Sequence, residues 1–130
     1  MDITTSQAFD VLGKALSKAA DIDVAANIVV VDTAGHLKAF VRMDDAYLGS
    51  IDIAQGKAKT AMLFRMPSHE VGEFLKPEAR AYGIAQTSGG LVGFKGGLPV
   101  KSGGVVVAYI GVSGGSPDQD YEIATAGSIL

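Results

Sequence analysis

Acidic and basic side chains gather in one stretch of the 130-residue chain, where they could hold a polar ligand. Arg42 is followed closely by Asp44 and Asp45, and Asp52 comes a little later. A guanidinium can clamp a carboxylate ligand, such as a propionate, through two parallel hydrogen bonds. The same residues also fit a structural role, in which Arg42 pairs with an aspartate to fix the loop and Asp52 interacts with a helix dipole. Both interpretations stay open.

Lys57, Lys59 and Thr60 form a second candidate group on a segment rich in small residues. Gly56 and Ala58 would let a flat ligand or another subunit approach this segment closely. Either lysine could then contact an anionic group, and Thr60 could offer its hydroxyl oxygen to a ligand or a metal. The alternative is a solvated lysine face beside a stripe of packed alanines.

His36 and His69 are the only histidines, and therefore the only imidazoles that could be axial ligands of a cofactor metal. His69 stands at the start of a short predicted helix, and His36 follows a predicted hairpin turn. Solvated histidines are ordinary at both kinds of position, so exposure without ligation is the alternative. A zinc site built on the two histidines would need carboxylates that the sequence does not place.

Glycine-rich segments at 93–99 and 111–115 invite comparison with phosphate-binding loops. Neither segment fits the spacing of a Walker motif or of a dinucleotide-binding fingerprint. A phosphate at the start of the last predicted helix would also meet Asp118 and Asp120. Ser113 has no histidine at a spacing typical of a nucleophile and its base, so a hydrolase triad has no support. Structural turns are the favoured interpretation.

The composition indicates an ordered globular protein, with 48% hydrophobic and 19% charged residues. A net charge of −3 argues against a nucleic-acid or anionic-membrane partner. The absence of cysteine excludes disulfides, thiolate metal sites and a cysteine nucleophile. Neither a signal peptide nor a membrane-spanning run is visible, so we expect a cytoplasmic protein. Positive mean hydropathy and 17 glycines suggest apolar surface buried between the subunits of a homo-oligomer.

Hydrophobic periodicity and turn residues predict the elements that must position these groups. Helices are expected where apolar residues recur at helical spacing behind a capping residue, and strands where β-branched residues run together or alternate with polar ones. In chain order we expect a helix over 5–20, a hairpin over 27–42, a helix that Ser50 caps and that ends before Pro67, a short helix that Ser68 caps, one or two strands within 84–100, a strand over 105–110 and a helix that Ser116 caps.

This order of elements indicates a single domain over residues 1–130, of the α/β (α+β) class. The hairpins predict a mostly antiparallel sheet of about five strands, flanked by helices. One face of the middle helix consists of mostly small residues, Ile51, Ala54, Ala58 and Ala61, which would let it lie close to the sheet or to another helix.

Five blocks of sequence, in order, resemble the GlcG/HbpS family, which is also called the haem-degrading domain family and is related to the C-terminal domain of PduO-type proteins. The blocks lie at 29–35, 42–46, 50–61, 96–100 and 110–115. The resemblance implies a profilin-like sandwich that assembles into dimers up to octamers. It also implies that some members bind haem or a corrinoid, while others accompany glycolate, propanediol or glycerol pathways.

Three hypotheses about function follow. The first is an oligomeric binding protein that holds haem or a corrinoid in a cleft near residues 42–60, with His69 or His36 as metal ligand. The second is an accessory enzyme acting on a small hydroxy acid or aldehyde, in which Arg42 holds a carboxylate and Asp44 or Asp52 is the general base. The third is a structural subunit of a larger complex.

Overall fold

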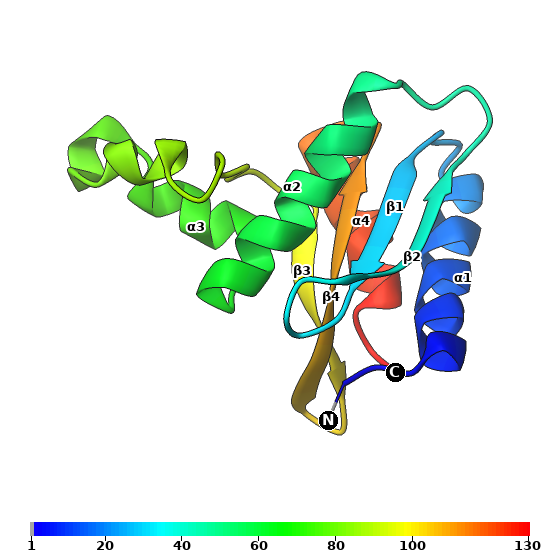
Figure 1. Cartoon of the computed structure of the whole chain (residues 1–130). Coiled ribbons are helices and arrows are strands. Elements are labelled where there is room, and N and C mark those ends of the chain that lie inside the picture. The colour runs from blue at the N-terminus through cyan, green and yellow to red at the C-terminus, as the bar shows by residue number, and fades with distance from the viewer. Residues whose placement is uncertain (1) are drawn as a thin grey trace.

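The computed structural model describes residues 2–130 and contains a four-stranded antiparallel sheet with the strand order β2-β1-β4-β3 (Figure 1). The elements in chain order are α1 (Thr5–Asp21), β1 (Asn27–Val31), β2 (Leu37–Arg42), α2 (Gly49–Phe64), α3 (Ser68–Phe74), the 3₁₀ helices η1 (Pro77–Ala79) and η2 (Tyr82–Gln86), β3 (Gly97–Ser102), β4 (Val105–Ser113) and α4 (Pro117–Gly127). The predicted mixture of helices with an antiparallel sheet is confirmed. None of the described helices is long and apolar enough to cross a membrane.

Helices cover both faces of the sheet, with α1 and α4 on one face and α2 on the other (Figure 1). Successive strand residues point to opposite faces. Ile28 and Val30 therefore join the core under α1 and α4, while Val29 and Val31 pack against α2. This explains why the first strand is apolar without alternation, since neither of its faces meets water.

Helix α2 lies very close to the sheet because one strand carries a glycine beneath it. A Cβ atom built on Gly111 of β4 would stand 2.0 Å from the carbonyl oxygen of Ala54 and 2.9 Å from the backbone nitrogen of Ala58. Backbone atoms cannot move aside as a side chain can, so only glycine fits. The predicted packing face of Ala54, Ala58 and Ala61 is confirmed, and all three are fully buried.

The expected strand count of about five is wrong, because the region before β3 forms no strand in the described chain. Residues 82–92 instead form η2 and a loop in which Ser88, Gly89 and Gly90 have positive φ. Their backbone groups bond locally, with the Thr87 N–H donating to the Ile84 carbonyl at 2.9 Å. A segment with consecutive left-handed residues cannot present the regular edge that pairing requires.

Of the three predicted helix caps, the one at Ser116 is confirmed by geometry, and those at Ser50 and Ser68 are wrong. The side chains of Thr4 and Ser116 both form complete capping boxes. Helix α2 begins at Gly49, one residue before Ser50, and no side chain caps it. Ser68 lies inside α3 after Pro67, and its buried hydroxyl donates to the Phe94 carbonyl at 2.6 Å and accepts from the Gly97 N–H at 2.9 Å.

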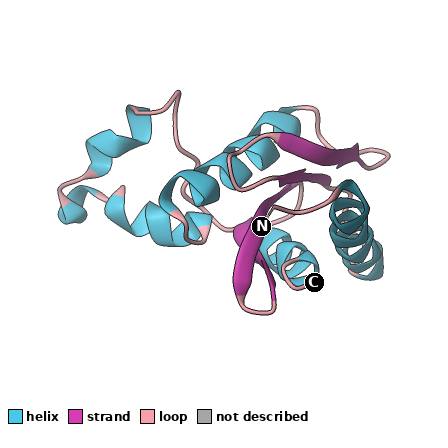
Figure 2. Ribbon diagram, turned by 60° about the horizontal axis from the view of Figure 1, so that its bottom comes forward, coloured by secondary structure: helices cyan, strands magenta, loops and turns pink. Residues whose placement is uncertain are grey.

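Residues 68–92, which we call the arm, project from one side of the sheet (Figures 1 and 2). The arm contains α3, η1 and η2, and the chain returns from it along α2 into β3. The two hydrogen bonds of the Ser68 hydroxyl connect the start of the arm to the start of β3. The arm therefore creates new surfaces beside α2 that the sheet alone does not have.

Candidate functional site

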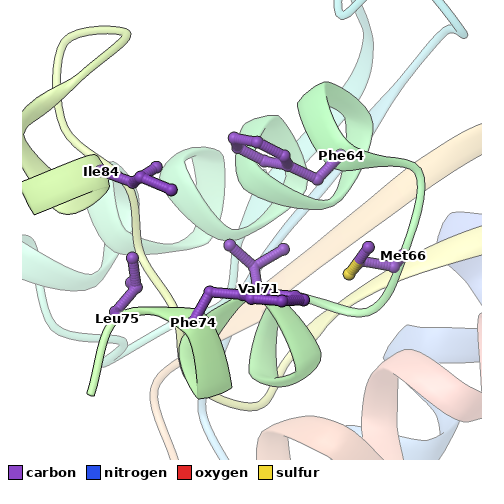
Figure 3. A pocket seen from close by; sticks show the side chains of 6 residues that line it. All are labelled: Phe64, Met66, Val71, Phe74, Leu75 and Ile84. Atoms are coloured by element: carbon purple, nitrogen blue, oxygen red, sulfur yellow. The ribbon is translucent and has the colours of Figure 1, made fainter. Parts of the chain in front are cut away.

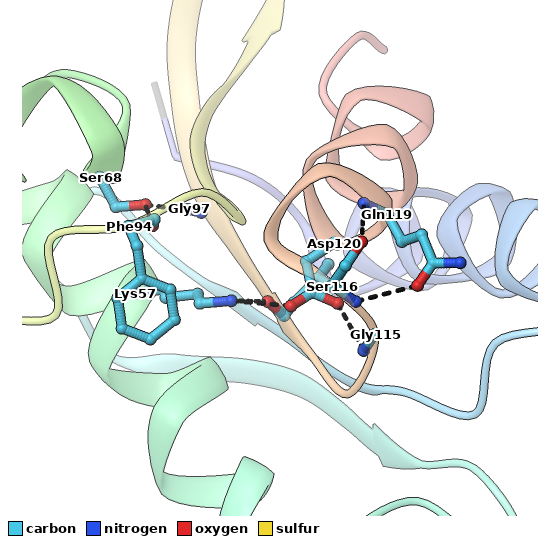
Figure 4. Close-up of polar contacts among 9 residues, drawn as sticks. Lys57, Ser68, Phe94, Gly97, Gly115, Ser116, Gln119 and Asp120 are labelled. Carbon is cyan, nitrogen blue, oxygen red and sulfur yellow. Dashed lines mark hydrogen bonds and ion pairs between the residues drawn. The ribbon is translucent and has the colours of Figure 1, made fainter.

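Lys57 is fully buried, and its side chain extends from α2 towards the end of β4 and the start of α4 (Figure 4). Its Nζ atom donates to the Val112 carbonyl at 2.8 Å and to Asp120 Oδ2 at 3.0 Å, and lies 4.7 Å from the centre of the Phe94 ring. A glycine clears its path, since a Cβ on Gly96 would stand 2.8 Å from this Nζ. The alternative in which Lys57 lies on a solvated face is wrong. Its ammonium points at Asp120 and lines neither of the two concave sites described below.

Asp120 supplies the counter-charge for the buried Lys57 ammonium, and Asp120 is itself only 2% exposed. Its second oxygen, Oδ1, accepts from the Gly115 N–H at 2.8 Å. Burial raises the pKa of Asp120, an effect that the Lys57 ammonium and the backbone hydrogen bonds oppose. Burial likewise lowers the pKa of Lys57, opposed by Asp120. The pair joins α2 to α4 around the end of the sheet, which is a structural role.

Sequence reasoning treated Asp120 only as an acidic residue in the first turn of the last helix. A signal for its burial was present, because Asp120, Ile123, Ala124 and Gly127 follow the spacing of one helix face. All four are buried. An acid on the apolar face of a helix requires a partner inside the protein. The identity of that partner, 63 residues away, could not be predicted from spacing.

An apolar pocket of about 260 Å³ opens between the end of α2 and the arm (Figure 3). Only apolar side chains line it, from α2, the following turn, α3 and η2: Phe64, Met66, Val71, Phe74, Leu75 and Ile84. Phe74 is 53% exposed and Phe64 is 38% exposed, so aromatic surface faces outward at its mouth. Open apolar concavities of this kind are typical of sites for apolar ligands or partners. The sequence did not predict this pocket.

A second, polar cleft of about 350 Å³ lies along the middle of α2. One wall consists of Asp52, Gln55, Gly56 and Lys59, and the other is the segment 89–92. The structure thus brings together two of the predicted site residues, Asp52 and Lys59. Lys59 Nζ also contacts the carbonyl oxygen of Ser88.

The predicted Thr60 supports this cleft from behind. It is fully buried, and its hydroxyl oxygen accepts a hydrogen bond from the Val92 N–H at 2.9 Å. This bond fixes the far wall against α2.

Arg42 and Asp44 lie apart from both concave sites. Arg42 is the last residue of β2, Asp44 is in the loop that follows, and both side chains are exposed. Neither lines the apolar pocket or the polar cleft, and Arg42 makes no ion pair within residues 2–130. The residues of the enzyme hypothesis are therefore not assembled around one cavity, because Asp52 lines the polar cleft whereas Arg42 and Asp44 lie outside it.

The two histidines occupy different environments. The His36 side chain is 80% exposed, and its Nδ1 lies 3.5 Å from Asp32 Oδ2. His69 Nδ1 is buried without a hydrogen-bond partner, and the His69 ring meets Tyr121 edge to face at 5.4 Å between centroids. The described part of the chain contains no group of three or more His, Cys, Asp or Glu side chains that could hold a metal ion.

Comparisons with known proteins agree on one group of relatives. A family model described as "Haem degrading protein HbpS-like" matches residues 3–128. An uncharacterized 15.0 kDa protein from the dhaT-dhaS intergenic region of Citrobacter freundii is 41% identical over 109 residues, which are 83% of this chain and 77% of the relative. The corrinoid adenosyltransferase PduO of Salmonella typhimurium is 34% identical over 85% of this chain, which spans only 33% of PduO. A solved PduOC:heme complex has a TM-score of 0.90 at 30% identity, over 98% of this chain and 93% of the other.

Proposed function

This chain belongs to the HbpS-like family, and from that premise we propose that it is a small binding protein for a tetrapyrrole of the haem or corrinoid class. The observation that carries the proposal is the similarity to PduOC, which was solved with heme and matches 98% of this chain at a TM-score of 0.90. The open apolar pocket beside the arm supports it, because a tetrapyrrole macrocycle is flat and apolar and gains free energy when it leaves water.

We place the edge of the macrocycle in the apolar pocket between α2, α3 and η2. The six apolar side chains that line it offer no competing polar group. Its volume of about 260 Å³ is below the roughly 300–1,000 Å³ typical of a complete small-molecule site. One chain would thus cover only part of the ligand. A second copy of the chain would cover the rest, which makes a homo-oligomer part of this proposal.

His69 is the imidazole that we assign to the metal of the ligand. It belongs to α3, the helix that also supplies Val71 and Phe74 to the pocket. Its buried Nδ1 has no partner in the protein, which is an unmet polar group of the kind that a ligand satisfies. The His69 ring packs against Tyr121 and does not line the pocket, so ligation would require both the ring and α3 to shift. His36 is mostly in water and already interacts with Asp32.

Titration of the full chain with haemin, followed by absorbance, tests the proposal. We expect a shifted Soret band at stoichiometric haemin, and absence of any shift would refute haem binding. Phe74→Asp should abolish the shift, whereas Phe9→Asp should not, because Phe9 is comparably exposed at 59% but lies on α1. Equal binding by these two variants would refute the pocket assignment.

The metal ligand is tested separately by the position of the same band. His69→Ala should move the band towards that of haem without an imidazole ligand, while His36→Ala should match the unmodified chain. An unchanged spectrum in His69→Ala, with haemin still bound, would refute ligation by His69 and leave the pocket assignment intact. Loss of the band shift in His36→Ala alone would instead identify His36 as the iron ligand.

A further inference from the structure

The polar cleft along α2 is a second concave site, and unlike the apolar pocket it is lined by charged and polar side chains as well as by Leu91 and Val92. Asp52, Gln55, Gly56 and Lys59 stand at helical spacing on one face of α2, which aligns them along a single wall. The cleft has a volume of about 350 Å³, within the range of roughly 300–1,000 Å³ for small-molecule sites. It contains both an acid and a base, whereas no charged side chain lines the pocket.

The far wall of the cleft is fixed and leaves room for a ligand. The Val92 N–H donates to Thr60 at 2.9 Å, and a Cβ on Gly56 would stand 2.6 Å from the Val92 side chain, so wall and helix touch here. At Gly90, by contrast, an added Cβ would meet nothing within 4 Å. Gly90 lines this open part with backbone and no side chain, whereas at Gly89 an added Cβ would stand 3.2 Å from Lys59 Nζ. The cleft is therefore closed where Val92 touches Gly56 and open beside Gly90.

The spacing of the charges sets the length of the ligand. Asp52 and Lys59 are seven residues apart on α2, which corresponds to about 10 Å along the helix axis. Gln55 lies between them and can both donate and accept hydrogen bonds. A ligand that uses the whole wall needs an anionic group for the ammonium, a donor for the carboxylate, and polar groups along its middle. A two- or three-carbon acid is too short to reach both ends.

We propose that this cleft binds an elongated, polyhydroxylated carboxylate of the sugar-acid type. The ligand carboxylate would contact Lys59, its far hydroxyl would donate to Asp52, and a central hydroxyl would contact Gln55. Backbone groups of Gly89 and Gly90 would face the side of the ligand that points away from α2. The proposal does not depend on haem binding, because the cleft shares no lining residue with the apolar pocket.

Isothermal titration calorimetry of the full chain with D-gluconate tests this inference. Lys59→Gln and Asp52→Asn should each weaken gluconate binding by about tenfold or more, because each removes a charged partner of the ligand. Lys38→Gln removes the same charge on β2, outside the cleft, and should bind as the unmodified chain does. Undetectable gluconate binding, or equal losses in all three variants, would overturn the proposal.

Two competing probes test the class of ligand. Lactate should bind much more weakly than gluconate, since it is too short for both charges, and equal affinity would refute the argument from length. Tighter binding of 6-aminohexanoate would replace the sugar acid with an amino acid as the ligand. Amide resonances of Gly89 and Gly90 should shift on gluconate addition while that of Gly13 on α1 stays fixed, which locates the site without any substitution. The opposite pattern would place gluconate elsewhere.

Discussion

Replacing Lys57 by methionine is expected to destabilise the protein by about 3–5 kcal/mol. Methionine keeps an unbranched apolar side chain in the same space, so few packing contacts are lost. It removes the ammonium that lies 3.0 Å from Asp120 Oδ2 and 2.8 Å from the Val112 carbonyl. The Asp120 carboxylate then remains, 2% exposed, without a counter-charge. The lower end of the range is expected, because the Gly115 N–H still donates to Asp120.

The loss of stability in Lys57→Met should depend on pH in a defined direction. Burial raises the pKa of Asp120, and the Lys57 ammonium opposes that rise in the unmodified protein. Without Lys57, the folded-state pKa of Asp120 therefore lies further above its unfolded value. The folded variant then holds a proton that the unfolded chain has released, so its stability falls as pH rises through this interval. We expect a larger loss at about pH 7 than at about pH 5.

Urea unfolding followed by circular dichroism measures both effects, and a double variant supplies the control. Lys57→Met with Asp120→Asn removes both charges and leaves an acceptor oxygen for the Gly115 N–H. It should recover more than half of the lost stability and show none of the added pH dependence. A loss below about 1 kcal/mol in Lys57→Met, which is typical of exposed ion pairs, would refute the burial argument. So would a double variant no more stable than Lys57→Met.

Other predictions concern backbone geometry and use the same unfolding assay. Gly111→Ala would place a Cβ 2.0 Å from the Ala54 carbonyl oxygen and should cost about 3 kcal/mol or more, and an unchanged midpoint would contradict the close approach of α2 to β4. Gly13→Ala, which meets nothing within 4 Å on α1, should instead leave stability unchanged or raise it by up to about 1 kcal/mol. Ser116→Ala removes the hydroxyl that accepts from the Gln119 N–H at 3.2 Å and should cost about 1 kcal/mol, so equal stability would show that this cap is not needed.

The elements that local chemistry determines could be predicted from the sequence. The hairpin of β1 and β2 follows from a β-branched run, a turn at Gly35 and an alternating segment, and the structure has these strands in antiparallel register. The start of α4 follows from the Ser-Pro-Asp-Gln sequence at 116–119, whose capping box is complete. In both cases, the residues that decide the structure are within a few positions of one another.

Elements whose form depends on distant contacts were predicted less well. Serine is a common helix cap, but the Ser68 hydroxyl forms hydrogen bonds with the backbone of Phe94 and Gly97, which come nearly thirty residues later. The segment 84–92 contains apolar residues in the manner of a strand, yet it forms η2 and a loop in which Ser88, Gly89 and Gly90 have positive φ. The burial of Lys57 could not be predicted either, because it depends on Asp120, which is distant in the sequence.

Helix α2 serves three neighbours at once, and this arrangement explains why its sequence mixes alanine, glycine and lysine. Its alanines meet the sheet, Lys57 meets Asp120, and the face with Gly56 and Lys59 meets the returning end of the arm. Small residues are needed on the first face and a flexible cationic chain on the second, so no single amphipathic stripe could result.

The contacts of the arm also determine how well its two sites are preformed. The arm is fixed at its start by the Ser68 hydroxyl and at its end by the bond from Val92 to Thr60, and the Phe94 ring lies over Lys57. Between these anchors it carries η2 and one wall of the apolar pocket. A wall held at both ends loses little conformational entropy when a ligand binds, and that saving increases affinity. These two anchors therefore contribute to binding along with the side chains that line the pocket and the cleft.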